Sequence, residues 1–167
     1  WGTSVGGVET LTSHRALPED AYPSQLEKTD PTDVTLHFEK GELVGLNEAF
    51  DTSVNTILKL EEIASKYAIG RDIHVGDTIV GIKGRVGFEA AAATVIIKAH
   101  HLLEKHVLSK WQQNLKEGLG STYGMLLHDG QYFEPAMRDV EAYLASSQKT
   151  VTGKVFITLK PYHFSLN

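Results

Sequence analysis

The sequence predicts an α+β fold, in which helices pack mainly on one face of an antiparallel sheet built from hairpins, and an extended N-terminal arm precedes the sheet. Three observations favour this class. Short segments that alternate apolar and polar residues come in pairs, and turn residues separate the members of each pair. Segments with apolar residues at helical spacing lie between these pairs. Strands joined in hairpins form antiparallel sheets, which commonly bury one face.

The first 33 residues predict the arm. They have few periodic apolar positions, and they contain the turn-forming residues Gly6, Gly7, Pro18, Pro23 and Pro31. A loop of this length is uncommon inside a compact domain and usually packs on something else. We therefore divide the chain into an arm over residues 1–33 and a domain over residues 34–167. Because the first residue is Trp1 and the last, Asn167, lies in a predicted strand, we expect a piece of a longer protein.

The first half of the domain predicts two hairpins around one helix. Alternation over residues 34–38 indicates a strand that returns over residues 43–46. A helix is expected to begin at Thr52 or Ser53 and to end at Gly70, since helices commonly end at a glycine in the left-handed conformation. The second hairpin is expected over residues 73–82, with Gly76-Asp77 as its turn.

The second half predicts three helices and a closing hairpin. A helical pattern covers residues 89–108, and Ser109 with Gln112 forms a capping box for the next helix. That helix contains three glycines, so we expect a break in its second half. Pro135 fits the first turn of a further helix. The last two strands are expected over residues 155–159 and 162–166.

Composition and charge exclude several functions. The chain of 167 residues has a formal net charge of −5 and no polybasic run, so nucleic-acid binding has no electrostatic support. No apolar stretch approaches the roughly 20 residues that span a bilayer, and no signal peptide is recognisable. The chain has no cysteine and therefore no disulfide. We expect a cytoplasmic protein without membrane or nucleic-acid partners.

Two charged clusters are candidate sites. His100, His101, Glu104 and His106 suggest a metal, but two histidines four residues apart with a glutamate beside the first are absent, so we expect no metal.

Lys83, Arg85 and Glu89 are expected between the second hairpin and the long helix. Two cations before a helix N-terminus suit a carboxylate or a phosphate. The alternative, a solvated charged turn, is favoured by composition alone.

Four segments resemble argininosuccinate synthases, in the order and at about the spacing of that family. Residues 1–7 are similar to its tryptophan, serine and paired glycines. Residues 69–71, followed by 81–85 and Glu89, resemble its Gly-Arg and Gly-Met-Lys-Ser-Arg-Gly-x-Tyr-Glu stretches. Residues 123–135 (YGMLLHDGQYFEP) resemble Tyr-x-Glu-Leu-Val-Tyr-x-Gly-x-Trp-x-x-Pro, and residues 151–155 match a glycine-containing strand near the family's end.

The resemblance implies a ligase that joins citrulline and aspartate with ATP and magnesium in arginine biosynthesis. In this family an N-terminal domain binds ATP through a Ser-Gly-Gly-Leu-Asp-Thr-Ser loop, which this sequence lacks. The C-terminal domain contributes citrulline contacts and most of a tetramer interface. The chain is therefore expected to hold no catalytic residue or cofactor of its own and to be inactive alone. Apolar residues over 95–108 spread around more than one helix face, which favours self-association through the helices between Glu89 and Leu127; the alternative is a central helix packed on both sides within one chain. Residues 1–33 would link it to the nucleotide-binding domain.

Carried over residue by residue, the citrulline site is altered, which implies a divergent branch. Ser4 matches a citrulline-binding serine, the family's citrulline-binding glutamate falls on Gly76, and its tyrosine falls on Phe88. Asp77 replaces the missing carboxylate if the turn shifts by one residue; otherwise it is an ordinary turn residue. The competing interpretation is a stand-alone ligand-binding or oligomerisation module without catalysis.

Overall fold

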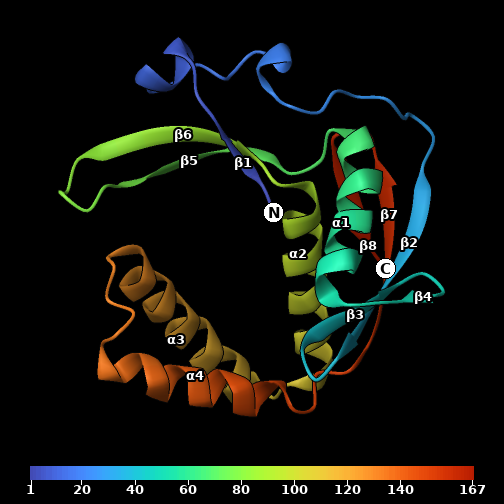
Figure 1. Ribbon diagram of the computed structural model, residues 1–167, viewed down its shortest axis with the longest axis vertical. Helices are drawn as coiled ribbons and strands as arrows, with labels where there is room; N and C mark the ends of the chain where they lie inside the picture. Colours follow the sequence, from blue (N-terminus) through green and yellow to red (C-terminus); the bar gives the residue numbers. More distant parts are fainter.

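The computed structural model describes residues 1–167 and confirms the α+β class (Figure 1). Four helices accompany one antiparallel sheet of five strands and another of three strands. The arm and the three-stranded sheet lie at one end of the molecule, and two of the helices lie at the other (Figure 1).

The five-stranded sheet contains both hairpins that apolar alternation predicted at the two ends of the domain. Its order is β4 (Ala49–Phe50), β3 (Glu42–Leu46), β2 (Thr32–Glu39), β7 (Gly153–Lys160) and β8 (His163–Leu166). β2 and β7 pair along their length, with Leu36 opposite Val155, so distant parts of the chain close the sheet. β4 was not predicted, because two exposed residues carry no periodicity.

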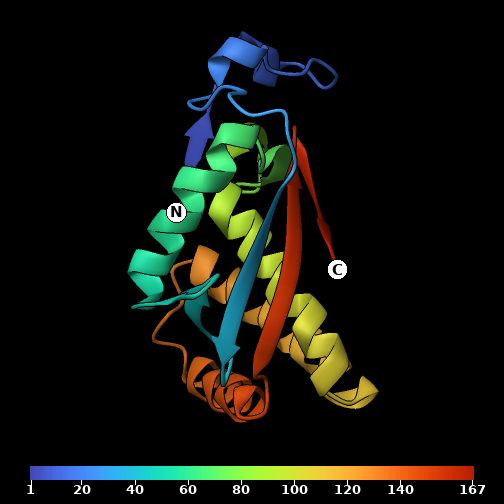
Figure 2. The same ribbon diagram turned by 90° about the vertical axis from the view of Figure 1, so that its right-hand side faces the viewer.

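Two helices cover one face of this sheet, as Figures 1 and 2 show: α1 (Ser53–Ala64) and α2 (Ala91–Val107). Leu36, Ile157 and Leu159 face the helices and are fully buried, whereas Phe156 on the other face is exposed. α1 is capped by Thr52, as predicted, but it ends at Ala64. A 3-10 turn follows at Ser65–Tyr67, and the left-handed residue is Ala68 as well as the predicted Gly70.

The three-stranded sheet corrects the second hairpin. β5 (Arg71–Asp77) pairs with β6 (Lys83–Glu89), and β1 (Thr3–Val5) adds to β6. Gly76-Asp77 is not a turn, because Gly76 pairs with Gly84 within the ladder. The turn spans residues 78–82, where the amide of Gly81 donates to the Thr78 carbonyl and Gly81 has a φ of 81°.

The arm lies along one side of the three-stranded sheet (Figure 1). It contains two 3-10 turns, η1 (Val8–Leu11) and η2 (Glu19–Ala21), and its Leu17 is buried. Leu17 packs over Gly87, where an added Cβ would lie 2.2 Å from the leucine Cδ1. Only glycine at position 87 therefore allows this close approach.

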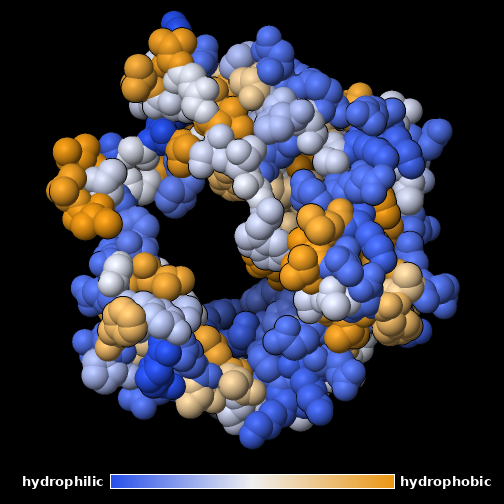
Figure 3. Space-filling view, in the orientation of Figure 1, coloured by the Kyte–Doolittle hydropathy of each residue, from blue (hydrophilic) through white to orange (hydrophobic).

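The last two helices, α3 (Lys110–His128) and α4 (Pro135–Gln148), pack against each other and project from α2 (Figure 1). The predicted capping box of Ser109 and Gln112 and the proline start at Pro135 are confirmed. The predicted break in α3 is wrong, because the helix continues through all three glycines. Figure 3 shows a deep hollow between this helix pair and the β5–β6 hairpin.

Candidate functional site

The predicted site residues divide between the two faces of the three-stranded sheet. Residues directly opposite each other in a ladder share a face, and the face alternates along each strand. Ser4 lies opposite Phe88, and Phe88 lies opposite Asp72. Their face also carries His74, Gly76, Gly84 and Val86; we call it the open face, and it points towards the hollow (Figures 1 and 3). The arm face carries Arg71, Ile73, Val75, Asp77, Lys83, Arg85, Gly87 and Glu89.

On the arm face, Glu89 and Arg71 form a buried ion pair. The Arg71 Nε donates to Glu89 Oε2 at 2.9 Å, and the two side chains are 9% and 4% exposed. The amide of Ser24 donates to the other Glu89 oxygen at 3.1 Å, and Arg71 donates to the Ser24 carbonyl. Burial alone would lower the pKa of Arg71, but hydrogen bonds to Glu19 and Glu89 raise it above its usual value. This pair binds the arm to the sheet.

Arg85 binds the arm further out, entirely through main-chain oxygens. Its guanidinium donates to the carbonyls of Thr12, Glu9 and Arg15, the last at 3.1 Å. Lys83 instead pairs with Asp77 at 2.7 Å, and both of these side chains are exposed. The expected position of Lys83, Arg85 and Glu89 in a loop before the helix is wrong, because all three lie in β6. The two cations of the expected anion site are therefore already bound within the chain, Lys83 to a carboxylate and Arg85 to main-chain carbonyls.

Asp77 does not lie near Ser4 and Phe88. It is on the arm face, and it is five residues along β5 from Asp72, the partner of Phe88. At about 3.3 Å per residue, that separation is roughly 17 Å. The one-residue turn shift that motivated Asp77 is contradicted, because no turn occurs at Gly76-Asp77.

Two residues of the open face were missed from the sequence, Asp72 and His74. The His74 ring lies over Gly76, where an added Cβ would be 2.4 Å from its Nε2 atom. Asp72 lines a cavity of about 260 Å³. Its other lining residues include Phe88 on the same face, Lys98 of α2 and His163 of β8. Strict alternation from Arg71 would have placed both residues with Phe88, had the turn been assigned to residues 78–82.

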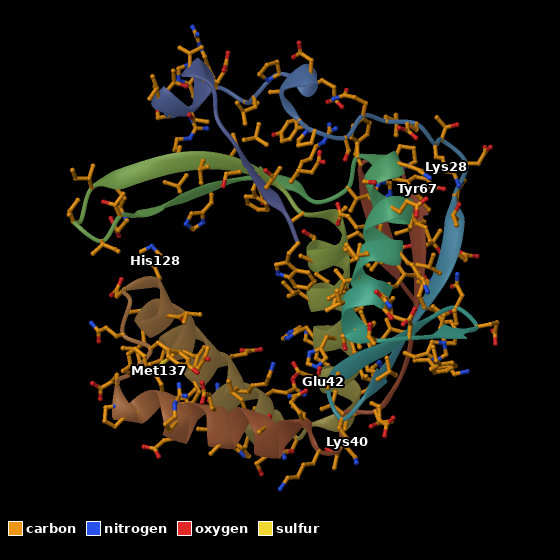
Figure 4. All side chains as sticks on the ribbon, viewed as in Figure 1. Lys28, Lys40, Glu42, Tyr67, His128 and Met137 are labelled. Carbon is orange, nitrogen blue, oxygen red and sulfur yellow. The ribbon has the colours of Figure 1, made fainter.

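The histidine cluster on α2 is organised around buried Glu104. Lys116 of α3 approaches its Oε1 at 2.7 Å, and Gln148 of α4 donates to the same oxygen at 2.7 Å. His100 and His101 lie 3.7 and 3.9 Å from the carboxylate. Burial lowers the pKa of His100 below its usual value, although the negative charge of Glu104 acts in the opposite direction. No group of three or more potential ligand side chains in the chain could hold a metal ion. Figure 4 shows how His128, at the other end of α3, points towards the hairpin.

A family model described as the arginosuccinate synthase C-terminal domain matches residues 2–165. The chain belongs to this family. The argininosuccinate synthase of Dictyoglomus turgidum is 40% identical over 167 residues, which are 99% of the chain and 42% of that relative. The synthase of Pyrococcus furiosus is 37% identical over 163 residues, covering 95% of the chain and 40% of the relative. That of Methanocaldococcus jannaschii is 33% identical over 162 residues, covering 95% and 41%.

The chain thus spans about two fifths of the length of the curated relatives that it matches. In this argininosuccinate synthase C-terminal domain, Ser4 and Phe88 lie side by side on the open face. None of its helices combines the length and apolarity needed to cross a bilayer.

Proposed function

We propose that this chain is the C-terminal part of an ATP-dependent ligase that joins citrulline and aspartate to give argininosuccinate. The observation that carries the proposal is the family match over residues 2–165. The position of Ser4 beside Phe88 supports a citrulline-binding role for the open face, since both lie on the side that the arm leaves uncovered. A hydroxyl can both donate and accept a hydrogen bond, which suits either end of a zwitterionic substrate.

ATP and magnesium would bind outside these residues. The 167 residues contain no glycine-rich phosphate-binding loop, and no cluster of side chains could hold a metal ion. The open face would therefore supply substrate contacts, while activation of citrulline would take place on groups from another domain.

We expect the full-length gene product to form argininosuccinate, AMP and pyrophosphate from citrulline, aspartate and ATP, and the isolated 167-residue chain to form none. The measurement is pyrophosphate release with and without citrulline, with a heat-inactivated sample as the blank. Pyrophosphate release by the isolated chain above the blank would contradict this division of labour. A full-length protein that binds citrulline but releases no pyrophosphate would favour the non-catalytic binding module.

The α3–α4 pair supports the proposed role in self-association. α3 has no buried residue, although it exposes Trp111, Leu115 and Met125 to between 53% and 70%. Exposed apolar residues grouped on one helix are typical of protein–protein interfaces. On α2, Val95, Ile96 and Leu103 are buried within this chain and cannot contact a second copy, whereas Ile97 is 62% exposed.

We expect Trp111→Lys combined with Leu115→Lys to shift the protein towards monomers in sedimentation velocity, because two charges enter the proposed interface. Gly124→Lys provides the control: it adds charge on the same helix, about 220° around the axis from Trp111 at 100° per residue, in open space. A wild-type protein that remains monomeric at high micromolar concentration would contradict the proposed assembly.

A further inference from the structure

The open face lacks a carboxylate where the family resemblance puts one, and it has another carboxylate nearby. Gly76 has no side chain, and the His74 ring fills the space above it. Of the seven residues of β1, β5 and β6 on the open face, Asp72 alone is acidic. We propose that Asp72 binds the ammonium group of the amino-acid substrate on this face. The inference rests on the proposed function and names a specificity residue for it.

The register places Asp72 where one ligand can contact it and Ser4 together. Ser4, Phe88 and Asp72 form a row across β1, β6 and β5. Neighbouring strands lie about 4.8 Å apart, so the outer two residues are separated by roughly 10 Å of sheet, with the Phe88 ring between them. An amino acid lying on that ring would have a hydroxyl at one side and a carboxylate at the other.

Asp72 also has free hydrogen-bonding capacity. Its Oδ1 accepts the amide of Ile73 at 2.7 Å, and no cation of the chain pairs with it. A carboxylate offers about four acceptor positions, so most of them face solvent. Asp77 and Glu89, by contrast, are paired with Lys83 and Arg71 on the other face.

The cavity beside Asp72 has the charges of a zwitterion binding site. It measures about 260 Å³, and its lining includes the Asp72 carboxylate, the Lys98 ammonium and the Phe88 ring. Lys98 lies above the ring of Phe164, 5.6 Å from its centroid, and is otherwise exposed. Arg71 also lines the cavity, but it is already paired with Glu89 and Glu19, which leaves Asp72 and Lys98 as the unpaired charges. These two charges and the aromatic floor match the ammonium, carboxylate and aliphatic parts of an α-amino acid such as citrulline.

The test compares Asp72→Asn with Asp77→Asn in the full-length protein. Asparagine keeps the shape of aspartate but loses the charge that strengthens a hydrogen bond to an ammonium. For Asp72→Asn we expect the Kd of citrulline by calorimetry and its KM to rise about 10- to 100-fold, while kcat and the KM for ATP barely move. Asp77→Asn, on the same strand but the opposite face, should leave all four unchanged.

A rescue variant separates binding from structure. Asp72→Asn combined with His74→Ala and Gly76→Glu returns a carboxylate to the open face, with the clashing ring removed. We expect it to recover most of the citrulline affinity that Asp72→Asn loses. An unchanged citrulline Kd in Asp72→Asn, or equal losses in Asp72→Asn and Asp77→Asn, would overturn the inference.

The outcomes distinguish the inference from the proposed function. If the wild-type protein binds citrulline but makes no argininosuccinate, the proposed function fails, and the effect of Asp72→Asn on the citrulline Kd still decides the role of Asp72. If the wild-type protein makes argininosuccinate and Asp72→Asn binds citrulline normally, only the inference fails. A wild-type protein that does not bind citrulline contradicts both.

Discussion

Replacing Glu89 with alanine is expected to lower the free energy of unfolding by about 3 kcal/mol, because the change leaves the Arg71 guanidinium buried without its main partner. The Ser24 amide loses its acceptor at the same time. Arg71 keeps its contact with Glu19, so the expected loss lies at the lower end of the range for broken buried pairs. Urea denaturation followed by circular dichroism measures the change.

Glu19→Ala is the matched control, since Glu19 contacts the same guanidinium but is 54% exposed. Exposed pairs contribute less than about 1 kcal/mol, so this variant should be much milder. Hydrogen exchange adds a local readout, because the Ser24 amide should lose protection in Glu89→Ala. Equal destabilisation by the two substitutions would show that burial of the pair is not what holds the arm.

The second large effect is expected at Glu104, where alanine should lower the free energy of unfolding by about 2 kcal/mol. Glu104 is 3% exposed, and it links α2 to Lys116 of α3 and Gln148 of α4. Its loss leaves Lys116 unpaired, but that side chain is 26% exposed and water can solvate it, so the effect stays below that of a fully buried pair. Urea denaturation again measures the total.

The loss at Glu104 should be concentrated in the helix pair. Amide exchange in α3 and α4 is expected to accelerate more than exchange in β2 and β7, because few other contacts join α3 to the body. Glu117→Ala tests the specificity, since Glu117 lies on α3, on the other side of the α2–α3 contact, and its side chain is 63% exposed. Uniform acceleration over all elements in Glu104→Ala would contradict a local role.

Apolar alternation predicted the two hairpins of the five-stranded sheet, β2–β3 and β7–β8, because one face of each meets α1 and α2. Val34, Leu36 and Phe38 are buried on that face, so burial imposes the period that the sequence carries. The capping box at Ser109 was equally predictable, because its two hydrogen bonds are local.

The three-stranded sheet was misread for a physical reason. One of its faces meets solvent and the other meets an irregular arm, so neither imposes an apolar period on β5 and β6. Ile79, Val80 and Ile82 resemble a strand, but they form the exposed tip of the hairpin, at 65% to 79% exposure. Gly76-Asp77 resembles a turn, whereas its backbone is held in the ladder by Gly84 and Lys83. The misplaced turn also concealed the shared face of Asp72 and Phe88.

The three main-chain contacts of Arg85 bear on how the arm can change during evolution. Because the Arg85 guanidinium donates to carbonyl oxygens, these contacts depend on the path of the backbone and not on the side chains at positions 9, 12 and 15. Substitutions at positions 9 and 15 should therefore be tolerated more readily than at position 12, where the threonine hydroxyl donates to the Glu9 carbonyl and accepts from the Arg15 amide. Inserting or deleting a single residue would move the carbonyls out of reach of Arg85. A two-stranded ribbon is only marginally stable without further support. For the open face on the other side of the sheet, the length of the arm therefore matters more than the identity of most of its side chains.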